Sequence, residues 1–536
     1  METKCGLYHC LKNTYFSTPN ANCLYYLNRY FTYQEVINKV NKLASGLINL
    51  GIKKGEAVTV CLPNIPEAVY LLYAINQIGA INNLVHPLMR HDQLLEIMNK
   101  VKSKFLFCLD QNYSQFKDFK ELNIKVITCS PVDEFSFITK AAYKKQNKEK
   151  LKDFKDGHLV FTDLLKYGST IKEVKTCFED AVYLHSGGTT GKAKTIALSS
   201  YAINILCAQA PFILKRKQFR DLHMMAVLPM FHGFGLCMGV HIVLANGAIS
   251  TLIPKFSSKL VCKYLSKGKI NYMIGIPVLY EALLNNEKFS KKNLQNLFIC
   301  FVGGDSVTTS LIERFNKFMK DNNSPCHLYQ GYGLTETVTV CNVNTDTDCN
   351  IESVGKCLPH MEAKIVDLNT GRDLENYKAG EIYLSGESLM NGYRFDTELS
   401  DPFVLDSFGK KWLKTGDYGY LDENNYLHFI QRLKRIIKVN GINVFPSEVE
   451  NLMTSLPEIF QAAAIGKEDE KFGNMLYLYI VKNKKLAFKY TTDELNSLIK
   501  EKLGVYSQPK KIIFVDSLPQ TLIGKIDYVK ISKWED

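Results

Sequence analysis

The first third of the chain alternates short apolar runs with segments that are apolar at helical spacing, and this alternation restricts the fold most strongly. A capping-box pattern at Thr32 and Glu35 predicts the start of a helix, which Gly51 is placed to end. The apolar run 57–62 then predicts a strand, and residues 67–78 are again apolar at helical spacing. Strand–helix alternation of this kind predicts a mostly parallel sheet that is covered by helices on both faces.

The length of the chain and its later part predict two unequal domains. The 536 residues are too many for one small domain, and their composition is that of a globular protein. We predict a large N-terminal α/β region of several subdomains, with mostly parallel sheets, over residues 1–431. A small, mobile α+β domain is predicted over 432–536, where strand and helix patterns alternate again at residues 461–465, 475–481, 492–503 and 512–515.

The charge balance and the cysteines exclude few functions. The chain has 66 Lys and Arg against 54 Asp and Glu, so the formal net charge of +12 is modest for this length. Such an excess permits nucleic acid or anionic lipid as a partner, but it equally suits an enzyme for polyanionic small molecules. The 15 cysteines are scattered and form no C-x-x-C pair, which favours reduced thiols over a secreted disulfide framework. Residues 1–20 lack the layout of a signal peptide, so we expect a cytoplasmic protein.

One long stretch, residues 224–254, contains no Asp, Glu, Lys or Arg and is long enough to span a bilayer. Pro229, His232, His241 and Asn246 interrupt this stretch, and such groups are costly in lipid. We therefore predict buried core and the wall of a pocket, with His241 in the core, and no transmembrane segment.

A second stretch, residues 140–175, is rich in lysine and has little apolar pattern. A solvated connector is the simpler interpretation of such a charge run. A docking patch for phosphates is the alternative.

A glycine-rich loop follows the short apolar run 181–184, and residues 182–194 read V-Y-L-H-S-G-G-T-T-G-K-A-K. Glycines allow the backbone to approach an anion closely, while the N–H groups, hydroxyls and lysines of such a loop donate to phosphate oxygens. The loop departs from a Walker A motif, because Ser186 and Ala193 stand where that motif has Gly and Ser or Thr. We therefore expect a phosphate-binding loop of another kind than that of P-loop NTPases.

The segment S-G-G-T-T-G-x-A-K in this loop resembles the signature of the adenylate-forming (ANL) superfamily, which includes acyl- and aryl-CoA synthetases, luciferases and adenylation domains of peptide synthetases. Six further motifs of that family follow in the family's order and extend the resemblance over nearly the whole chain: L-P-M-F-H-G-F-G at 228–235, G-G-D-S-V at 303–307, Q-G-Y-G-L-T-E-T at 330–337, T-G-D-Y-G at 415–419, R-L-K-R-I-I-K-V-N-G-I-N-V-F-P-S-E-V-E at 432–450 and P-Q-T-L-I-G-K at 519–525. Ala193 and Thr195 stand where the family usually has Pro and Gly. Neither change removes a donor, so we expect altered loop stiffness only.

The resemblance implies ATP, Mg²⁺ and coenzyme A as cofactors and assigns residues to the nucleotide. Binding of the ATP phosphates is expected at the loop residues Ser186, Thr189, Thr190, Gly191 and Lys194. Thr335 is expected on the α-phosphate and Glu336 on the magnesium ion, since a hard divalent ion binds one carboxylate together with phosphate oxygens. Tyr332 is expected against the adenine, while Asp417 accepts both ribose hydroxyls with the assistance of Arg432.

The resemblance also implies residues for the acid and for catalysis. Lys525 is expected to reach from the small domain to the carboxylate and the α-phosphate, where its charge stabilises the transition state. With Thr335 and Glu336 it forms the expected catalytic set, which His232 completes beside the carboxylate. The pocket around His232 is expected to be lined by Gly233, Gly303, Gly304 and Gly331.

Movement of the small domain is implied as well. Lys434 matches the family's hinge position, so the small domain is expected to swing away after adenylation. Its other face, with Lys438, Gly441 and Asn443, is then expected to close over the site for thioester formation. Gly441 leaves room for the pantetheine arm to pass the backbone.

The implied function is that of an ATP-dependent carboxylate–CoA ligase, an AMP-forming acid–thiol ligase. A carboxylate and ATP give acyl-AMP and pyrophosphate, and acyl-AMP and CoA then give acyl-CoA and AMP. The uncharged stretch after His232 has no Asp for the ammonium group of an amino acid. Room for a medium- or long-chain fatty acid, or for an aromatic acid such as a hydroxycinnamate, is suggested by Gly233, Gly235, Gly239, Gly303 and Gly304.

Two alternatives remain open from the sequence. The acyl or aryl group can be loaded onto the phosphopantetheine of a carrier protein instead of CoA. A catalytically inactive scaffold that binds nucleotide is the other, although the intact Lys194, Glu336, Asp417 and Lys525 speak against it. No nucleic-acid partner is expected.

Overall fold

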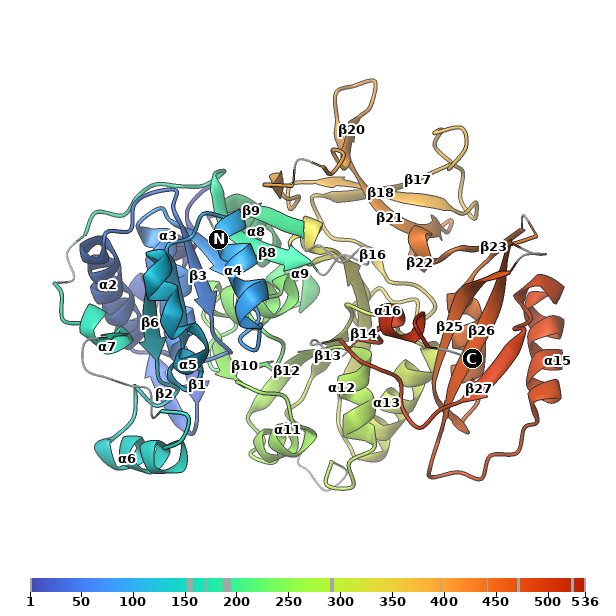
Figure 1. Ribbon diagram of the computed structural model, residues 1–536, viewed down its shortest axis with the longest axis horizontal. Helices are drawn as coiled ribbons and strands as arrows, with labels where there is room; N and C mark the ends of the chain where they lie inside the picture. The colour runs from blue at the N-terminus through green and yellow to red at the C-terminus, as the bar shows by residue number, and fades with distance from the viewer. Residues whose placement is uncertain are drawn as a thin grey trace.

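The computed structural model describes residues 2–151, 158–168, 171–186, 194–289, 294–396, 398–440, 442–469, 473–521 and 525–534. In this part of the chain, three sheets build a large N-terminal region and two smaller sheets build the C-terminal region (Figure 1). No helix within the described ranges is both long and apolar enough to cross a membrane.

The first large sheet is mostly parallel. Its strands in the described chain, from edge to edge, are β16 (Lys356–Cys357), β15 (Val340–Val343), β14 (His327–Gly333), β13 (Ile299–Val302), β12 (Ile270–Gly275), β10 (His223–Ala226), β11 (Ile249–Leu252), β1 (Asn22–Tyr26) and β2 (Arg29–Thr32). The run from β14 to β1 is parallel, and antiparallel strands flank it on both sides.

The second large sheet is also mostly parallel. Across the described residues its order is β19 (Gly392–Arg394), β9 (Lys194–Ser199), β8 (Asp180–Ser186), β4 (Ile81–Leu84), β3 (Ala57–Cys61), β5 (Phe105–Leu109), β6 (Lys125–Cys129) and β7 (Leu159–Val160). Strands from β8 to β7 are parallel, while β8–β9 and β9–β19 are antiparallel pairs. The predicted parallel α/β architecture is therefore confirmed.

The predicted helix signals are confirmed at both ends of α2 (Tyr33–Leu50). Thr32 caps the helix in a full capping box with Glu35, and Gly51 ends it in the left-handed region at φ 100°. The predicted strand and second helix are also present, as β3 and as α3 (Pro66–Gln77). Every residue of α3 is buried, so this helix lies inside the layers of the fold.

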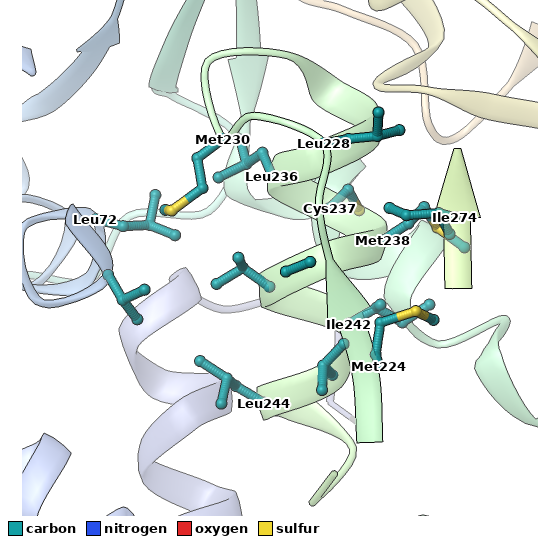
Figure 2. Close-up of a cluster of buried hydrophobic side chains, with 14 of the residues drawn as sticks. Leu72, Met224, Leu228, Met230, Leu236, Cys237, Met238, Ile242, Leu244 and Ile274 are labelled. Atoms are coloured by element: carbon teal, nitrogen blue, oxygen red, sulfur yellow. The ribbon is translucent and has the colours of Figure 1, made fainter. Parts of the chain in front are cut away.

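The uncharged stretch 224–254 forms core and pocket wall, as the sequence predicts. It contains β10, the π-helix η3 (Phe234–His241), α10 (Ile242–Ala245) and β11, and most of its residues are buried. Figure 2 shows Leu72 of α3 on one side of η3 and Ile274 of β12 on the other. His241 is a core histidine, since its two ring nitrogens contact Tyr73 Oη at 3.0 Å and Asn204 Oδ1 at 2.9 Å.

All but one of the remaining described helices of the large region bury some of their residues in the fold. They are α1 (Leu7–Ser17), α4 (His91–Lys100), α5 (Tyr113–Phe116), α6 (Phe137–Gln146), α7 (Phe161–Leu164), α8 (Ser200–Cys207), α9 (Ala210–Ile213), α11 (Ser258–Leu265), α12 (Pro277–Leu284) and α13 (Thr309–Asp321). A single hydrophobic cluster joins residues from both large sheets, so these layers share one core.

The third sheet is antiparallel and leads to the C-terminal region. Its strands are β17 (Met361–Val366), β18 (Gly380–Gly386), β21 (Lys411–Leu421), β20 (Phe403–Leu405) and β22 (Leu427–Arg432). Arg432 still pairs with Asp417 of β21 at the end of β22, and Lys434 follows directly in the short helix η5 (Leu433–Arg435). The boundary after residue 431 and the hinge at Lys434 remain predictions.

The C-terminal region has cores of its own. Its elements are the hairpin β23 (Ile437–Val439) and β24 (Ile442–Val444), the strands β25 (Ile459–Asp469), β26 (Gly473–Lys482) and β27 (Lys511–Phe514), and the helices α14 (Pro446–Thr454), α15 (Thr492–Leu503) and α16 (Tyr528–Ile531). One cluster packs α14 and α15 against the sheet, and another contains Ile531 of α16. The predicted small α+β domain is thus present.

Side-chain hydrogen bonds tie the start of α14 to β22. Ser447 Oγ lies 3.1 Å from the carbonyl oxygen of Ile430 and 3.0 Å from Gln431 Oε1. The backbone N–H of Ser447 also donates to Gln431 Oε1, at 3.3 Å. These contacts join residues on opposite sides of the predicted hinge.

Candidate active site

The main cavity lies where the large region meets the C-terminal segment around Lys525. Its volume is about 1580 Å³, and most of the sequence-predicted site residues line it. The parallel strands β13 and β14 end at this cavity, and the loops that follow them form part of its wall. Ligands of open parallel sheets bind at such carboxyl ends, so the topology supports a binding site here.

The hairpin of β8 and β9 brings the glycine-rich loop to the cavity. Ser186, the last residue of β8, is paired with Lys194, the first residue of β9, and both line the cavity. The loop between them contains the predicted phosphate ligands Thr189, Thr190 and Gly191, which lie outside the described residues. The predicted strand before the loop is therefore present, and a second strand begins directly after the loop.

Tyr393 connects Lys194 with Glu336. The ammonium group of Lys194 donates to Tyr393 Oη at 3.2 Å and lies 4.5 Å from the centroid of its ring. Tyr393 Oη in turn donates to Glu336 Oε1 at 2.9 Å. Tyr393 is in β19, which pairs with β9, so strand pairing holds the predicted phosphate and metal ligands together.

Tyr332 and Asp417 form a buried polar pair. Tyr332 lies in β14 and is only 9 % exposed, and its ring stacks on Phe429 with the centroids 5.7 Å apart. Its hydroxyl donates to Asp417 Oδ2 at 2.6 Å. Arg432 Nε lies 2.9 Å from the other oxygen, Asp417 Oδ1, as an ion pair.

Asp417 retains capacity to accept a hydrogen bond. Its side chain is fully buried, and Oδ1 has no hydrogen-bond partner in the described part of the chain, because the ion pair with Arg432 lacks hydrogen-bond geometry. Burial raises the pKa of Asp417 to about 6, although Arg432 and Tyr332 oppose the shift. A buried carboxylate oxygen without a partner is costly, and it marks a position that a ligand hydroxyl fits.

His232 has a comparable unpaired atom at the other end of the cavity. Its Nε2 is buried and without a hydrogen-bond partner among the described residues. Burial lowers the pKa of His232 to about 4, and the charges of Lys525 and His86 lower it further. At neutral pH the ring is therefore uncharged.

The predicted glycines line the cavity. At two of them, however, a side chain is absent for another reason than the one that the sequence suggests. Gly233, Gly303, Gly304 and Gly331 are all in the cavity wall. A Cβ on Gly233 would lie 1.8 Å from the carbonyl oxygen of Val338, and one on Gly303 would lie 2.7 Å from that of Gly331. At these two positions the missing side chain makes room for neighbouring backbone and not for an apolar acid. Gly304 instead has φ +79° and only an ordinary contact at 3.7 Å.

A second cavity of about 30 Å³, called the inner cavity below, adjoins the main one. Ile213, Met238 and Phe301 line both cavities. Apart from Asn246, the lining of the inner cavity consists of apolar and aromatic side chains.

Lys525 reaches the same cavity from the C-terminal region. Two hydrogen bonds join it to Thr521, because Thr521 N–H donates to the Lys525 carbonyl at 2.8 Å and Lys525 N–H donates to Thr521 Oγ1 at 3.2 Å. Burial lowers the pKa of Lys525, and Asp305 and Asp417 oppose this shift. Lys525 also affects the pKa of His232, so these charges act on one another within one site.

The residues predicted for thioester formation lie elsewhere. Lys434 lines the cavity, but Lys438 and Asn443 do not. They are cross-strand partners in the hairpin of β23 and β24, and both are exposed. Gly441, in the turn between them, lies outside the described residues.

Sequence reasoning missed Tyr393 and Asp305. Tyr393 belongs to none of the recognised motifs and reaches the site through strand pairing with β9. Asp305 lies within the recognised motif G-G-D-S-V, but its carboxylate was assigned no role. Its charge favours the charged forms of both Lys525 and Arg435, so it is a negative charge of the large region that lies near these cations.

Comparison with known proteins agrees with this geometry. The family model of the AMP-binding enzymes matches residues 12–394, and the model of the AMP-binding enzyme C-terminal domain matches residues 448–525. A probable CoA ligase, CCL5, of Humulus lupulus is 29% identical over 519 residues, which are 94% of this chain and 88% of that protein. A long-chain-fatty-acid–CoA ligase of Bacillus subtilis (strain 168) is 27% identical over 521 residues, with 95% and 90% of the two chains covered.

Solved structures share the fold. ATP-bound MatB from Rhodopseudomonas palustris superposes with a TM-score of 0.85 at 20% identity, covering 99% of both chains. A benzoate CoA ligase from Burkholderia xenovorans LB400 gives a TM-score of 0.82 at 18% identity, covering 98% of this chain and 100% of that one. Since one family model spans more than half of the residues, the chain belongs to the AMP-binding enzyme family, the adenylate-forming superfamily that its motifs resemble.

Proposed function

We propose that the protein is an ATP-dependent carboxylate–CoA ligase. In the first half-reaction a carboxylate oxygen attacks the α-phosphorus of ATP, and the bond to pyrophosphate breaks to leave acyl-AMP. In the second, the CoA sulfur attacks the acyl carbon and AMP leaves. The observation that carries this proposal is the convergence of Lys194, Glu336, Asp417 and Lys525 on one cavity, whose wall also includes a group of apolar side chains next to His232.

The nucleotide fits the polar end of the cavity. Asp417 Oδ1 is buried and, within the described residues, has an ion pair with Arg432 but no hydrogen-bond donor, which suits one ribose hydroxyl, while Oδ2 already accepts from Tyr332. In this arrangement Tyr332 would have to release Oδ2 before Asp417 binds both hydroxyls. The stacked rings of Tyr332 and Phe429 offer an aromatic surface for the adenine.

The phosphates require positive charge, because both reactants of the first step are anions. Lys194 lies at the end of the glycine-rich loop and is fixed by Tyr393. Glu336 fits a magnesium ligand, since Oε1 accepts one hydrogen bond from Tyr393 and no partner of Oε2 is recorded in the described ranges. Magnesium bound there would neutralise phosphate charge. Thr335, the neighbouring hydroxyl in the cavity wall, is proposed to contact the α-phosphate.

Lys525 is proposed as the catalytic cation between the two reactants. Its burial strengthens its electrostatic effect on nearby anions, while Asp305, Asp417 and the incoming phosphates favour its charged form. His232 is proposed to contact the substrate carboxylate, because its buried Nε2 has no other partner in the part of the chain described.

The substrate is proposed to be a medium- or long-chain fatty acid or an aromatic acid. The wall beyond His232 includes Phe231, Phe234, Met238 and Phe301, which suit an apolar acyl group. The apolar inner cavity behind Met238 favours an extended chain.

For the second half-reaction we propose rotation of the small domain about Lys434. Rotation would carry Lys525 away and bring the exposed hairpin with Lys438 and Asn443 toward the site. The location is proposed to be the cytoplasm, which the free thiols of all fifteen cysteines support.

A panel of carboxylic acids, assayed for pyrophosphate release with and without CoA, tests the proposal. We expect release with apolar acids and formation of the thioester with free CoA. Thioester formation with a phosphopantetheinylated carrier protein but not with CoA would select the carrier-loading alternative. Nucleotide binding without release of pyrophosphate from any acid would select the inactive scaffold.

A further inference from the structure

The short helix α6 stands away from the body of the molecule, at the lower left of Figure 1. None of its residues is buried. Its first two residues are large and apolar, yet Phe137 is 84% exposed and Ile138 is 79% exposed. Two adjacent apolar side chains with this exposure form a small apolar patch on the surface of the molecule.

The orientation of α6 is fixed by polar contacts on its inner side. Tyr143 Oη donates to Asp110 Oδ1 at 2.6 Å and accepts from Gln111 Nε2 at 2.8 Å. At 100° per residue, Ile138 is about 140° around the helix from Tyr143, so it faces away from the body. Ser136 caps the first turn through Thr139 N–H. The helix therefore presents its apolar pair outward.

The segment that contains this apolar pair is rich in lysine. Residues 137–151 contain Lys140, Lys144, Lys145, Lys148 and Lys150 against one acid, Glu149, so the segment has a formal charge of 5 − 1 = +4. No carboxylate within the described residues forms an ion pair with Lys144, Lys145 or Lys148. This is the part of the lysine-rich stretch for which a phosphate-docking patch was the alternative interpretation.

The neighbouring turn between β1 and β2 extends the same surface. The ring of Tyr26, beside this turn, lies 6.0 Å from that of Phe135, just before α6. Leu27 in the turn is 44% exposed. Lys267 donates to Asn28 Oδ1 at 2.5 Å and so adds a cation next to Leu27. We call α6 with Leu27 and Lys267 the basic–apolar surface.

We propose that the basic–apolar surface docks the protein onto an anionic lipid bilayer. Phe137, Ile138 and Leu27 would enter the boundary between headgroups and acyl chains, while the lysines contact lipid phosphates and carboxylates. Charge complementarity favours this partner, because exposed apolar side chains in a segment of formal charge +4 match an interface that is apolar below and negative above. Where the proposed function holds, docking places the enzyme beside the phase in which apolar acids dissolve.

Flotation of the full-length protein with vesicles tests the docking. We expect it to float with phosphatidylcholine vesicles that contain phosphatidylserine, weakly with phosphatidylcholine alone, and less at high salt, because salt screens the lysines. The paired change Phe137→Ser and Ile138→Ser should weaken partitioning by about tenfold or more, from the apolar area withdrawn from the bilayer. Its matched control is Phe408→Ser, at a position that is 94% exposed in the turn between β20 and β21.

The charge contribution is tested separately. Lys144→Gln with Lys145→Gln should weaken binding to the anionic vesicles by roughly fivefold for each lysine. Lys317→Gln with Lys320→Gln on α13 removes the same charge at exposed positions and should leave binding unchanged. Pyrophosphate release with a water-soluble acid should be equal in all four variants. This readout also separates loss of docking from loss of the proposed function.

Three outcomes would overturn the proposal. The first is wild-type protein that floats with neither kind of vesicle. The second is a loss of binding in Phe408→Ser that equals the loss in the α6 variant. The third is a dimer in solution that Phe137→Ser with Ile138→Ser dissociates in the absence of vesicle binding, because the surface would then join two copies of the chain.

Discussion

The two ends of the central cavity differ in how they use charge. At the end proposed for the nucleotide, the hydroxyl of Tyr393 joins Lys194 to Glu336, while Asp417 accepts from Tyr332 and forms an ion pair with Arg432. At the acid end, His232 is held uncharged among apolar side chains. The difference teaches that polar recognition needs particular atoms at particular positions, whereas an apolar pocket needs only shape.

Lys525 joins the two ends, and its removal should have the largest effect. We expect Lys525→Ala to slow pyrophosphate release by about 10²–10³-fold, the effect of losing one preorganised electrostatic group. Turnover of supplied acyl-AMP with CoA should change much less. Lys533→Ala, at an exposed position near the C-terminus, serves as the control. Persistent adenylation in Lys525→Ala would break the proposed mechanism.

The pH dependence of the KM for ATP tests the role proposed for Asp417. With its pKa raised to about 6, the carboxylate is charged at pH 7 and becomes protonated as the pH falls through 6. The neutral form accepts more weakly, so we expect the KM for ATP to rise below pH 6. Asp417→Asn should raise this KM by roughly 10–100-fold at pH 7, the range for a hydrogen bond to a charged group.

Comparing the KM for ATP of the wild type with that of Asp417→Asn also separates protonation of Asp417 from protonation of ATP. ATP itself gains a proton near the same pH, and this contribution is shared by both proteins. We therefore expect the ratio of the two KM values to shrink as the pH falls. A constant ratio would contradict titration of Asp417 in this range.

Met238 tests the acid end. Met238→Ala should join the inner cavity to the main one and shift preference toward longer acids by about tenfold, from the methylenes that then fit. The KM for ATP should stay unchanged. Met225→Ala truncates an equally buried methionine of β10 that lines neither cavity, and so controls for lost stability. A shift of equal size in both variants would argue against an acyl subsite behind Met238.

A change at Tyr393 is a further test of the end proposed for the nucleotide, and it should have the smallest effect on activity. Tyr393→Phe removes the hydroxyl between Lys194 and Glu336 but keeps the ring. We expect a decrease in kcat/KM for adenylation of about 2- to 10-fold, the value of one ordinary hydrogen bond, and a higher magnesium requirement. Tyr383→Phe in β18 is the control, and an equal loss there would contradict a special role of Tyr393.

Local signals made much of the fold predictable. The helix at 492–503 has a full capping box with Thr491 as its N-cap, and α15 covers the predicted residues. The residues proposed for the nucleotide each stand in a contiguous motif, and the described ones line the cavity as the motifs suggest, but their roles remain predictions. Tyr393 was not predictable, because its position depends on the pairing of β19 with β9, and strands so far apart in the chain carry no local signal for their register.

The glycines show a second reason why the acid end was harder to predict. Gly233 and Gly303 line the pocket as expected, but a side chain is excluded there by backbone carbonyls of Val338 and Gly331. The sequence shows where a side chain is absent. Only the packing in the structure shows whether backbone or a ligand can occupy the volume that the side chain would fill. The inner cavity behind Met238 likewise arises from several elements and has no motif.

The bonds of Ser447 across the predicted hinge carry a consequence for timing. The proposed rotation of the small domain would have to break the contacts of Ser447 with Ile430 and Gln431. Each such bond has a net value on the order of 1 kcal/mol, which changes the ratio of two orientations about fivefold. In the proposed mechanism these bonds would favour the orientation with Lys525 in the cavity. The free enzyme would then bind ATP and acid first and the thiol second.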